Sequence, residues 1–237
     1  MGDGRMAPGP GMRIFALARL LVGALLVTAI LSQLGLSLRY WRSIRLHDVG
    51  SRVGDFFSAF THESVLAGGV LLVIGGVLLL VGRQPRWHTV LQLAVLPSIL
   101  IAGLVYNLLL RQQPVPVGSQ LDWANEVMHV VAPIAVLLDW LLAPRPGRLR
   151  YRTALVVLVL PIAWLVYTFV RAPFVPDEIN RTVYYYPYGF LDPHVAGWSP
   201  VVQLVGELLV LAFVLGLLAV LARRLEARVA GRRPASA

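Results

Sequence analysis

The chain of 237 residues contains no cysteine, and only 14% of its residues are charged. The lack of cysteine excludes disulfide bonds, thiolate metal sites and cysteine nucleophiles. A soluble domain carries roughly 25% charged residues, so this chain has too little charge for an ordinary soluble protein. Apolar residues take their place: they make up 57% of the chain, and the mean hydropathy is +0.72.

Long apolar runs recur along the chain, each near the roughly 20 residues that a helix needs to cross a bilayer. We predict six spans, at residues 13–36, 56–81, 88–110, 121–142, 153–170 and 200–221. The runs are continuous, whereas the strands of a membrane barrel alternate polar and apolar residues. The sequence therefore predicts an all-α, polytopic bundle of six transmembrane helices.

Lysine is also absent, so all 21 basic residues are arginines, and the formal net charge is +9. In a soluble protein this excess would suggest nucleic acid. Here the arginines lie mostly between the spans, so we expect contacts with anionic lipid head groups and no nucleic acid partner. With both termini inside, the inner segments hold 13 arginines and the outer loops hold 7. The positive-inside rule then places both termini in the cytoplasm and the protein in the plasma membrane.

The two ends of the chain differ in composition from the predicted six-span domain, residues 13–222. Residues 1–12 are rich in Gly and Pro, and we expect them to be disordered. Residues 223–237 are rich in arginine, and we expect them to form a basic cytoplasmic tail.

Polar residues of the predicted spans gather at one level. Thr61 lies about six residues into the second span, His129 about eight into the fourth and Glu207 about seven into the sixth, which is roughly 8–12 Å below the outer boundary. Asn107 approaches the same level from the other side. An ionisable residue inside a span is costly and by default marks a functional site. We therefore predict a pocket under the outer face, roofed by the loop 171–198.

The fourth span carries its polar residues on one face. Asn125, Glu126, His129 and Pro133 recur at three- and four-residue steps. Pro133 removes a backbone donor close to His129 and favours a kink there. The spacing predicts an opening of the helix beside the histidine.

These residue types suit acyl-transfer chemistry. A threonine hydroxyl such as that of Thr61 is a poor nucleophile until a base takes its proton. A neutral histidine held by a carboxylate is such a base, and His129 is the candidate. The supporting candidates are Glu207 or Glu126 as the carboxylate and Asn125 or Asn107 as the donor to the oxyanion.

Each candidate also has a purely structural explanation. A threonine hydroxyl in a membrane helix often bonds back to its own backbone, which explains Thr61 equally well. Hydrogen bonding between helices explains His129, and pairing with a buried Arg or His explains Glu207. His62, His129 and a glutamate are possible metal ligands, but the HxxxH and HExxH spacings are absent. We therefore expect no metal and no cofactor; a bis-histidine cofactor site through His62 and His129 is a third hypothesis.

Other polar residues near the ends of the spans are expected to be structural. Asp139, at the inner end of the fourth span, is expected to pair with Arg145 or Arg148. The tyrosines of the segment 184–188 are expected to anchor the protein at the membrane interface.

Three segments carry a resemblance to a known family: FFSAFTHES (56–64), NEVMHVVAPIAVLLDWLL (125–142) and YYYPYGFLD (184–192). In these segments the chain resembles the bacterial Pr6Pr-type membrane proteins, which are related to the androgen-induced (FAR-17a) family of eukaryotes. The family pattern is Phe-Thr at the second span and Asn-x-x-x-His-x-x-x-Pro on the fourth. The resemblance covers residues 13–222.

Eukaryotic members of that family are integral-membrane hydrolases that cleave esters of hydroxy fatty acids with a Thr and a His. The resemblance implies that Thr61 is the nucleophile and His129 the general base, the same two residues that the depth of the spans selects. After the threonine, the family usually reads nearer to Ile-Gln-Ser-Asn. This chain departs from that pattern and reads His-Glu-Ser-Val at 62–65.

We therefore predict a lipid-ester hydrolase of the bacterial cell membrane, whose substrate is a lipid or amphiphilic ester that enters from the outer leaflet. The alternative is a non-enzymatic membrane protein that binds a lipid or small molecule in the same polar layer, or a transporter. Against transport, the sequence has no inverted repeat and no pair of broken helices.

Overall fold

The computed structural model describes residues 9–46, 48–143, 149–179 and 181–230, and these fold into helices without a β-strand. The helices are α1 (Pro10–Ser43), α2 (Val49–Ser58), α3 (Phe60–Leu80), α4 (Arg86–Val105), α5 (Asp122–Glu126), α6 (Ala132–Leu142), α7 (Val159–Arg171), α8 (Pro193–Ala196) and α9 (Trp198–Ala230). Wider π-helical turns extend α4 over Tyr106–Leu110 and join α5 to α6 over Val127–Val131; 3₁₀ turns lie at Tyr151–Leu158, Ala172–Phe174 and Gly189–Leu191.

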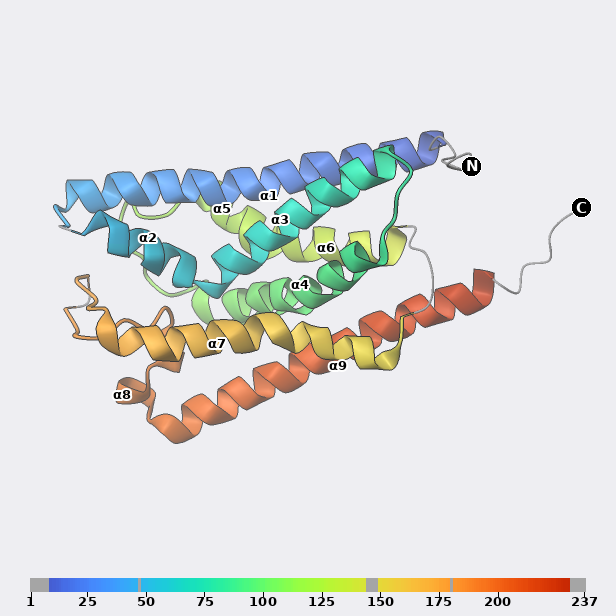
Figure 1. Cartoon of the computed structure of the whole chain (residues 1–237). Coiled ribbons are helices and arrows are strands. Elements are labelled where there is room, and N and C mark those ends of the chain that lie inside the picture. Colours follow the sequence, from blue (N-terminus) through green and yellow to red (C-terminus); the bar gives the residue numbers. More distant parts are fainter. Residues whose placement is uncertain (1–8, 47, 144–148, 180, 231–237) are drawn as a thin grey trace, which may run out of the picture.

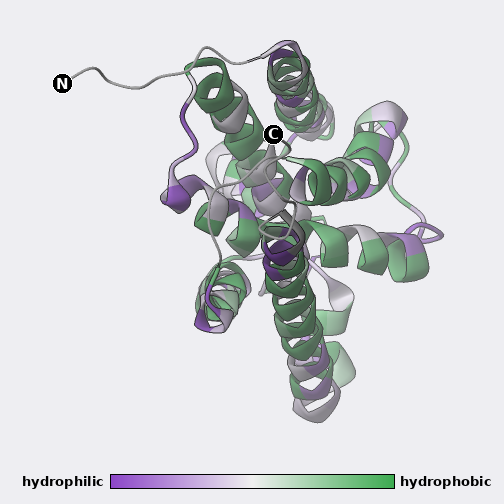
Figure 2. Ribbon diagram, turned by 90° about the vertical axis from the view of Figure 1, so that its right-hand side faces the viewer, coloured by the Kyte–Doolittle hydropathy of each residue, from purple (hydrophilic) through white to green (hydrophobic). Residues whose placement is uncertain are grey.

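Six stretches of the described chain are long and apolar enough to cross a membrane. They are Pro10–Ser43, Phe60–Leu80, Arg86–Leu110, Asp122–Leu142, Tyr151–Phe174 and Trp198–Arg228. Most of the ribbon of these helices has the green colour of hydrophobic residues in Figure 2. The chain is therefore an integral membrane protein with an all-α, six-helix polytopic bundle, and this confirms the predicted fold class.

Both ends of the chain lie at the same end of the bundle, whereas α2, α8 and the loop before α8 lie at the other end (Figure 1). This arrangement follows from an even number of crossings. We call the second end the loop end.

The helix boundaries differ from the predicted spans in ways that matter for the site. The predicted second span is broken at Ala59, whose extended backbone (ψ 117°) separates α2 from α3. The carboxylate of Asp48 caps α2 by accepting from the amide of Ser51 at 2.9 Å, so α2 is a helix in its own right. Thr61 is consequently the second residue of α3, and it does not lie six residues into a span as the sequence suggested.

The two termini of the six-span domain also differ from expectation. Helix α1 begins at Pro10, because proline suits the first turn of a helix, where its missing donor is not needed. Residues 10–12 are therefore helical, and the rest of the predicted disordered tail falls outside the described residues except Gly9. Helix α9 continues to Ala230, so the first half of the predicted basic tail is helical too.

Helix α4 is the centre of the bundle and contacts α3, α6, α7 and α9. On one side, α1 lies along α3 through small residues: a Cβ added to Gly23 would lie 2.7 Å from the carbonyl oxygen of Gly69. Such close backbone approach is typical of packing between membrane helices. On the other side, α7 and α9 have largely exposed apolar surfaces. This asymmetry leaves room for a pocket between α4, α7 and α9.

Candidate functional site

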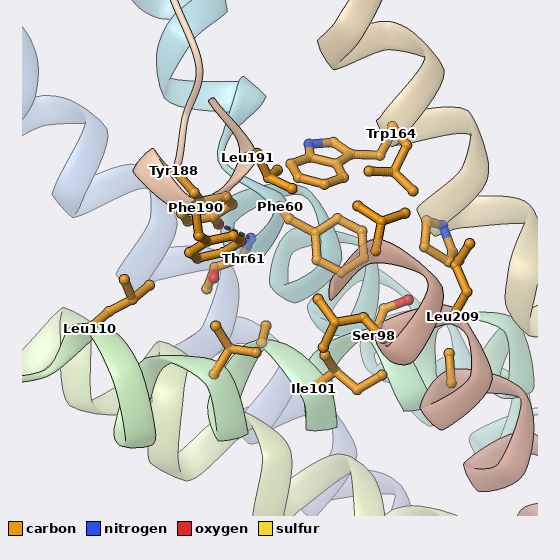
Figure 3. Close-up of a pocket in the computed structure, with 17 residues that line it drawn as sticks. Phe60, Thr61, Ser98, Ile101, Leu110, Trp164, Tyr188, Phe190, Leu191 and Leu209 are labelled. Atoms are coloured by element: carbon orange, nitrogen blue, oxygen red, sulfur yellow. Dashed lines mark hydrogen bonds between the residues drawn. The ribbon is translucent and has the colours of Figure 1, made fainter. Parts of the chain in front are cut away.

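A pocket lies between α4, α7 and α9, and the segment 188–191 closes it at the loop end (Figure 3). Its cavity volume is about 80 Å³. Its walls are almost entirely apolar or aromatic, with Trp164 from α7 and Leu208 from α9 among them. A lining of this kind suits the hydrocarbon chain of an amphiphile.

Thr61 lies on the wall of this pocket. Its side chain is buried at the start of α3, where the first amide groups of a helix have no partner within the helix. The amide of Thr61 donates to the hydroxyl of Tyr188 at 3.5 Å, and the two side-chain hydroxyls are also near enough to hydrogen-bond. Figure 3 shows these two side chains meeting at one side of the pocket.

A second hydroxyl faces the pocket from α4. Ser98 is 2% exposed and lines the pocket, and its Oγ has no hydrogen-bond partner among the described residues. Figure 3 places it on the side of the pocket away from Thr61. An unpaired hydroxyl in an apolar environment is costly, so this one is available to an oxygen or nitrogen of a ligand.

His129 lies in the π-helical turn between α5 and α6 and is 9% exposed. Its Nδ1 lies 3.0 Å from the backbone oxygen of Asn125. A carbonyl oxygen only accepts hydrogen bonds, so Nδ1 carries the proton and Nε2 carries the lone pair. The ring is thus held in the tautomer that a general base with a reactive Nε2 needs.

Two further contacts fix the plane of this imidazole. The His129 ring stacks on Tyr106, with centroids 3.7 Å apart and planes inclined by 22°. The side-chain amide of Asn125 donates to the Tyr106 hydroxyl at 2.5 Å. Tyr106 begins the π-helical turn that ends α4, so two π turns face each other at the histidine. Such turns occur frequently at functional sites.

The remaining predicted residues of this region serve the backbone and the surface. The amide of Asn107 donates to the carbonyl oxygens of Gly103 at 2.7 Å and His129 at 3.0 Å. The Glu126 carboxylate receives both terminal nitrogens of Arg111, at 2.7 and 2.9 Å. None of these hydrogen bonds of the Glu126 carboxylate and the Asn107 side-chain amide is made to the His129 ring. The Asn125 carbonyl orients the imidazole in this structure, and the supporting role of Glu126 stays a prediction.

Glu207 does not reach the pocket. It is exposed on α9 and accepts from Gln203, one turn earlier, at 2.9 Å. The neighbours Val205, Leu208 and Leu209 line the pocket in its place. The helix turns this carboxylate to the outer surface, and the role of Glu207 in orienting the imidazole stays a prediction.

Thr61 and His129 are not hydrogen-bonded to each other in the described part of the chain, and His129 does not line the Thr61 pocket. The first turn of α3 is nevertheless near the histidine: α3 packs on the π-helical turn, and His62 is within electrostatic range of His129. His62 itself is tied by Nδ1 to the Phe56 oxygen at 2.6 Å. Within the described residues, no group of three His, Cys, Asp or Glu side chains is placed to hold a metal ion.

No protein family model, curated protein or solved structure gives a significant match to the chain. The assignment of a function consequently depends on the site geometry and on the resemblance of the three segments described above.

The sequence did not indicate the polar cluster at the loop end that holds the roof of the pocket. Asp55 of α2 accepts from Arg171 at 2.6 Å, and its second oxygen lies 2.7 Å from a guanidinium nitrogen of Arg52. Arg52 also donates to the oxygen of Pro176, and the Tyr185 hydroxyl donates to the Asp55 carbonyl. We call this cluster the Asp55 clasp, because it joins α2 and α7 to the loop that carries Tyr188.

Burial raises the pKa of the Asp55 carboxyl above its ordinary value, although Arg171 and Arg52 act in the opposite direction. Burial likewise raises the pKa of the Tyr185 phenol. The only sequence signal for the clasp was the YYYPYGFLD segment, whose tyrosines we expected at the membrane interface. Tyr185 and Tyr188 instead point their hydroxyls into the protein.

Proposed function

We propose that this protein is a membrane-embedded lipid-ester hydrolase in which Thr61 attacks an acyl carbonyl while the acyl chain lies in the pocket between α4, α7 and α9. The observation that carries the proposal is the position of Thr61. Its hydroxyl lies on the wall of an apolar pocket and, unlike that of Ser98, it lies at a helix N-terminus, where amide groups favour developing negative charge.

The reaction has two balanced steps. In the first, Thr61 Oγ forms a bond to the acyl carbon, its proton passes to the base, and the alcohol leaves with that proton as the ester C–O bond breaks. In the second, water adds to the acyl carbon and the threonine ester breaks. The products are a carboxylic acid and the free Thr61 hydroxyl.

His129 is the base in this proposal, because Nδ1 is occupied by the Asn125 carbonyl and Nε2 keeps its lone pair. The ring and the hydroxyl share no hydrogen bond within the described residues. Catalytic hydrogen bonds are often long before the substrate binds, and they shorten in the complex. Proton transfer therefore requires that ester binding bring the two groups together, directly or through one water.

A fluorophosphonate probe with an alkyl chain tests this function, because it phosphonylates activated hydroxyls. We expect labelling of the wild-type protein and of Thr61→Ser, and none of Thr61→Ala. The matched control is Thr168→Ala, which replaces a buried threonine of α7 that does not line the pocket. Labelling that survives in Thr61→Ala removes Thr61 from the mechanism.

A second candidate function is binding of the same amphiphile without cleavage, and the missing contact between Thr61 and His129 favours it. In that case the wild-type protein is not labelled by the probe, but a fluorescent fatty acyl ligand still binds. Replacement of Leu208 by Trp, which fills the pocket, abolishes that binding. If the protein is not labelled and does not bind the ligand, both functions are excluded and only the membrane fold remains.

A further inference from the structure

The Tyr188 side chain comes from the loop before α8 and contacts Thr61 of α3 through its hydroxyl. Its ring is held in place by Phe190, which stacks parallel to it with centroids 5.1 Å apart, and by Trp164, whose ring centroid is 6.0 Å away. The loop that carries it is fastened by the Asp55 clasp. The hydroxyl is thus placed by three independent contacts.

The hydrogen-bonding capacity of this phenol is only partly used. Its oxygen accepts from the amide of Thr61 at 3.5 Å, and the Thr61 hydroxyl is also within hydrogen-bonding reach of the phenol. When Thr61 attacks an ester, the phenol proton can turn from the Thr61 oxygen to the oxygen of the ester carbonyl. A phenol has one proton to donate. A hydroxyl whose oxygen already accepts from a backbone amide becomes a somewhat better donor through its O–H, because hydrogen bonds in a chain polarise one another.

We propose that Tyr188 is a catalytic residue of the hydrolase, and that its hydroxyl donates to the carbonyl oxygen of the ester while Thr61 attacks the carbonyl carbon. This proposal depends on the function proposed above and extends it. Negative charge develops on that oxygen in the tetrahedral intermediate, and a donor already in place stabilises it without reorganisation.

The amides that the sequence suggested for this role are engaged elsewhere. Asn125 donates to the Tyr106 hydroxyl, and Asn107 donates to two backbone carbonyls. Neither residue lines the Thr61 pocket, whereas Tyr188 does. Burial also raises the pKa of the Tyr188 phenol, so it keeps the proton that it has to donate at neutral pH.

The test compares Tyr188→Phe with Tyr186→Phe. Both variants remove a hydroxyl from the same loop, but Tyr186 does not line the pocket. The measurement is kcat and KM for hydrolysis of p-nitrophenyl decanoate by detergent-solubilised protein. We expect kcat of Tyr188→Phe to fall by about 100-fold with KM changed less than about twofold, as for the loss of one oxyanion donor. Tyr186→Phe should match the wild type.

The outcomes separate the two proposals. If Thr61→Ala is inactive but Tyr188→Phe keeps the wild-type kcat, or changes only KM, Tyr188 is not a catalytic residue and the hydrolase stands. If Thr61→Ala keeps full activity, or the wild type is neither active nor labelled, the hydrolase fails and this inference fails with it.

A second variant guards against misfolding of Tyr188→Phe. Incorporation of 3-fluorotyrosine at position 188 keeps the ring and the hydroxyl but makes the phenol more acidic. If the phenol acts as a donor, the alkaline limb of the kcat–pH profile moves to lower pH. An unchanged profile in an active protein overturns the assignment.

Discussion

The imidazole of His129 lies against the ring of Tyr106, with centroids 3.7 Å apart, at the point where two π-helical turns meet. The stacking sets the plane of the imidazole, and the Asn125 carbonyl sets its protonated nitrogen. The direction of the Nε2 lone pair is therefore determined before any ligand arrives. This preorganisation is what a general base requires.

Replacement of Tyr106 tests the importance of that stacking. Tyr106→Ala removes the aromatic face, and because an aromatic pair contributes about 0.5–1.5 kcal/mol we expect up to about a tenfold slower reaction of Thr61 with the fluorophosphonate. Tyr106→Phe keeps the face and should stay within about twofold of the wild type. Equal rates in the three proteins would show that the stacking has no role in reactivity. Nitrogen-15 NMR of His129 checks the tautomer independently, with Nδ1 expected to be protonated.

The Asp55 clasp predicts a pH dependence of stability. The pKa of Asp55 is raised in the folded protein from the ordinary value of 3.8, so the folded state binds the proton more tightly than the unfolded state. The stability from this group is fully present below pH 3.8 and is lost as the pH rises through the raised pKa. Thermal unfolding of the wild type and of Asp55→Asn, measured from pH 3.5 to 7, tests this.

We expect the melting temperature of the wild type to fall relative to that of Asp55→Asn as the pH rises across this window, because only the wild type ionises there. The other titrating groups are common to both proteins and cancel in the difference. A difference that is constant with pH, or that changes in the opposite direction, contradicts the raised pKa.

Ser98 predicts a stabilising substitution. Its buried Oγ has no hydrogen-bond partner, so Ser98→Ala removes an uncompensated cost and should raise the free energy of unfolding by about 1 kcal/mol. The matched control is Ser64→Ala, since the Ser64 hydroxyl is also buried but donates to the Thr61 carbonyl at 3.3 Å. That variant should lose about 1 kcal/mol. Chemical denaturation in mixed micelles gives both values, and destabilisation of Ser98→Ala would show that its hydroxyl has a partner.

A buried ion pair joins the first and fourth spans, and Asp139 binds Arg19 there at 2.5 and 3.0 Å. From the sequence we expect Arg145 or Arg148 as the partner of Asp139, and these two lie outside the described residues. Asp139→Asn leaves the guanidinium without its charge partner, so we expect a loss of about 3–5 kcal/mol. The double variant Arg19→Leu, Asp139→Leu should lose far less, because it removes both charges. A double variant less stable than Asp139→Asn would contradict this account.

The six spans were predictable because the ability of a helix to cross a membrane depends on its length and local composition. The break at Ala59 was not predictable from the apolar run around it. It depends on α2 being held separately by Asp55, which binds Arg171 from 116 residues further along the chain. A hydropathy pattern carries no information about such a partner.

The residues of the candidate site also fall into two groups, those that could be predicted from the sequence and those that could not. Thr61 and His129 were identified from residue type, depth and the resemblance, and the local bond from His129 to the carbonyl four residues earlier is a property of one helical segment. The supporting roles of Glu207 and Glu126 stay predictions: the structure pairs these carboxylates with Gln203 and Arg111, because depth along a helix does not give the direction in which a side chain points. Tyr188 was missed because its hydroxyl meets Thr61 across 127 residues.

The sequence alone thus determined that the chain has six helices long and apolar enough to cross the membrane, and it named Thr61 and His129 as candidates, because span length and residue type can be read from local composition. Only the tertiary structure decided which hydroxyl faces the apolar pocket, which carbonyl holds the imidazole and which tyrosine covers the threonine. The reason is that these contacts depend on helix rotation and on a loop folding back over the bundle, and both are set by packing between segments far apart in the chain.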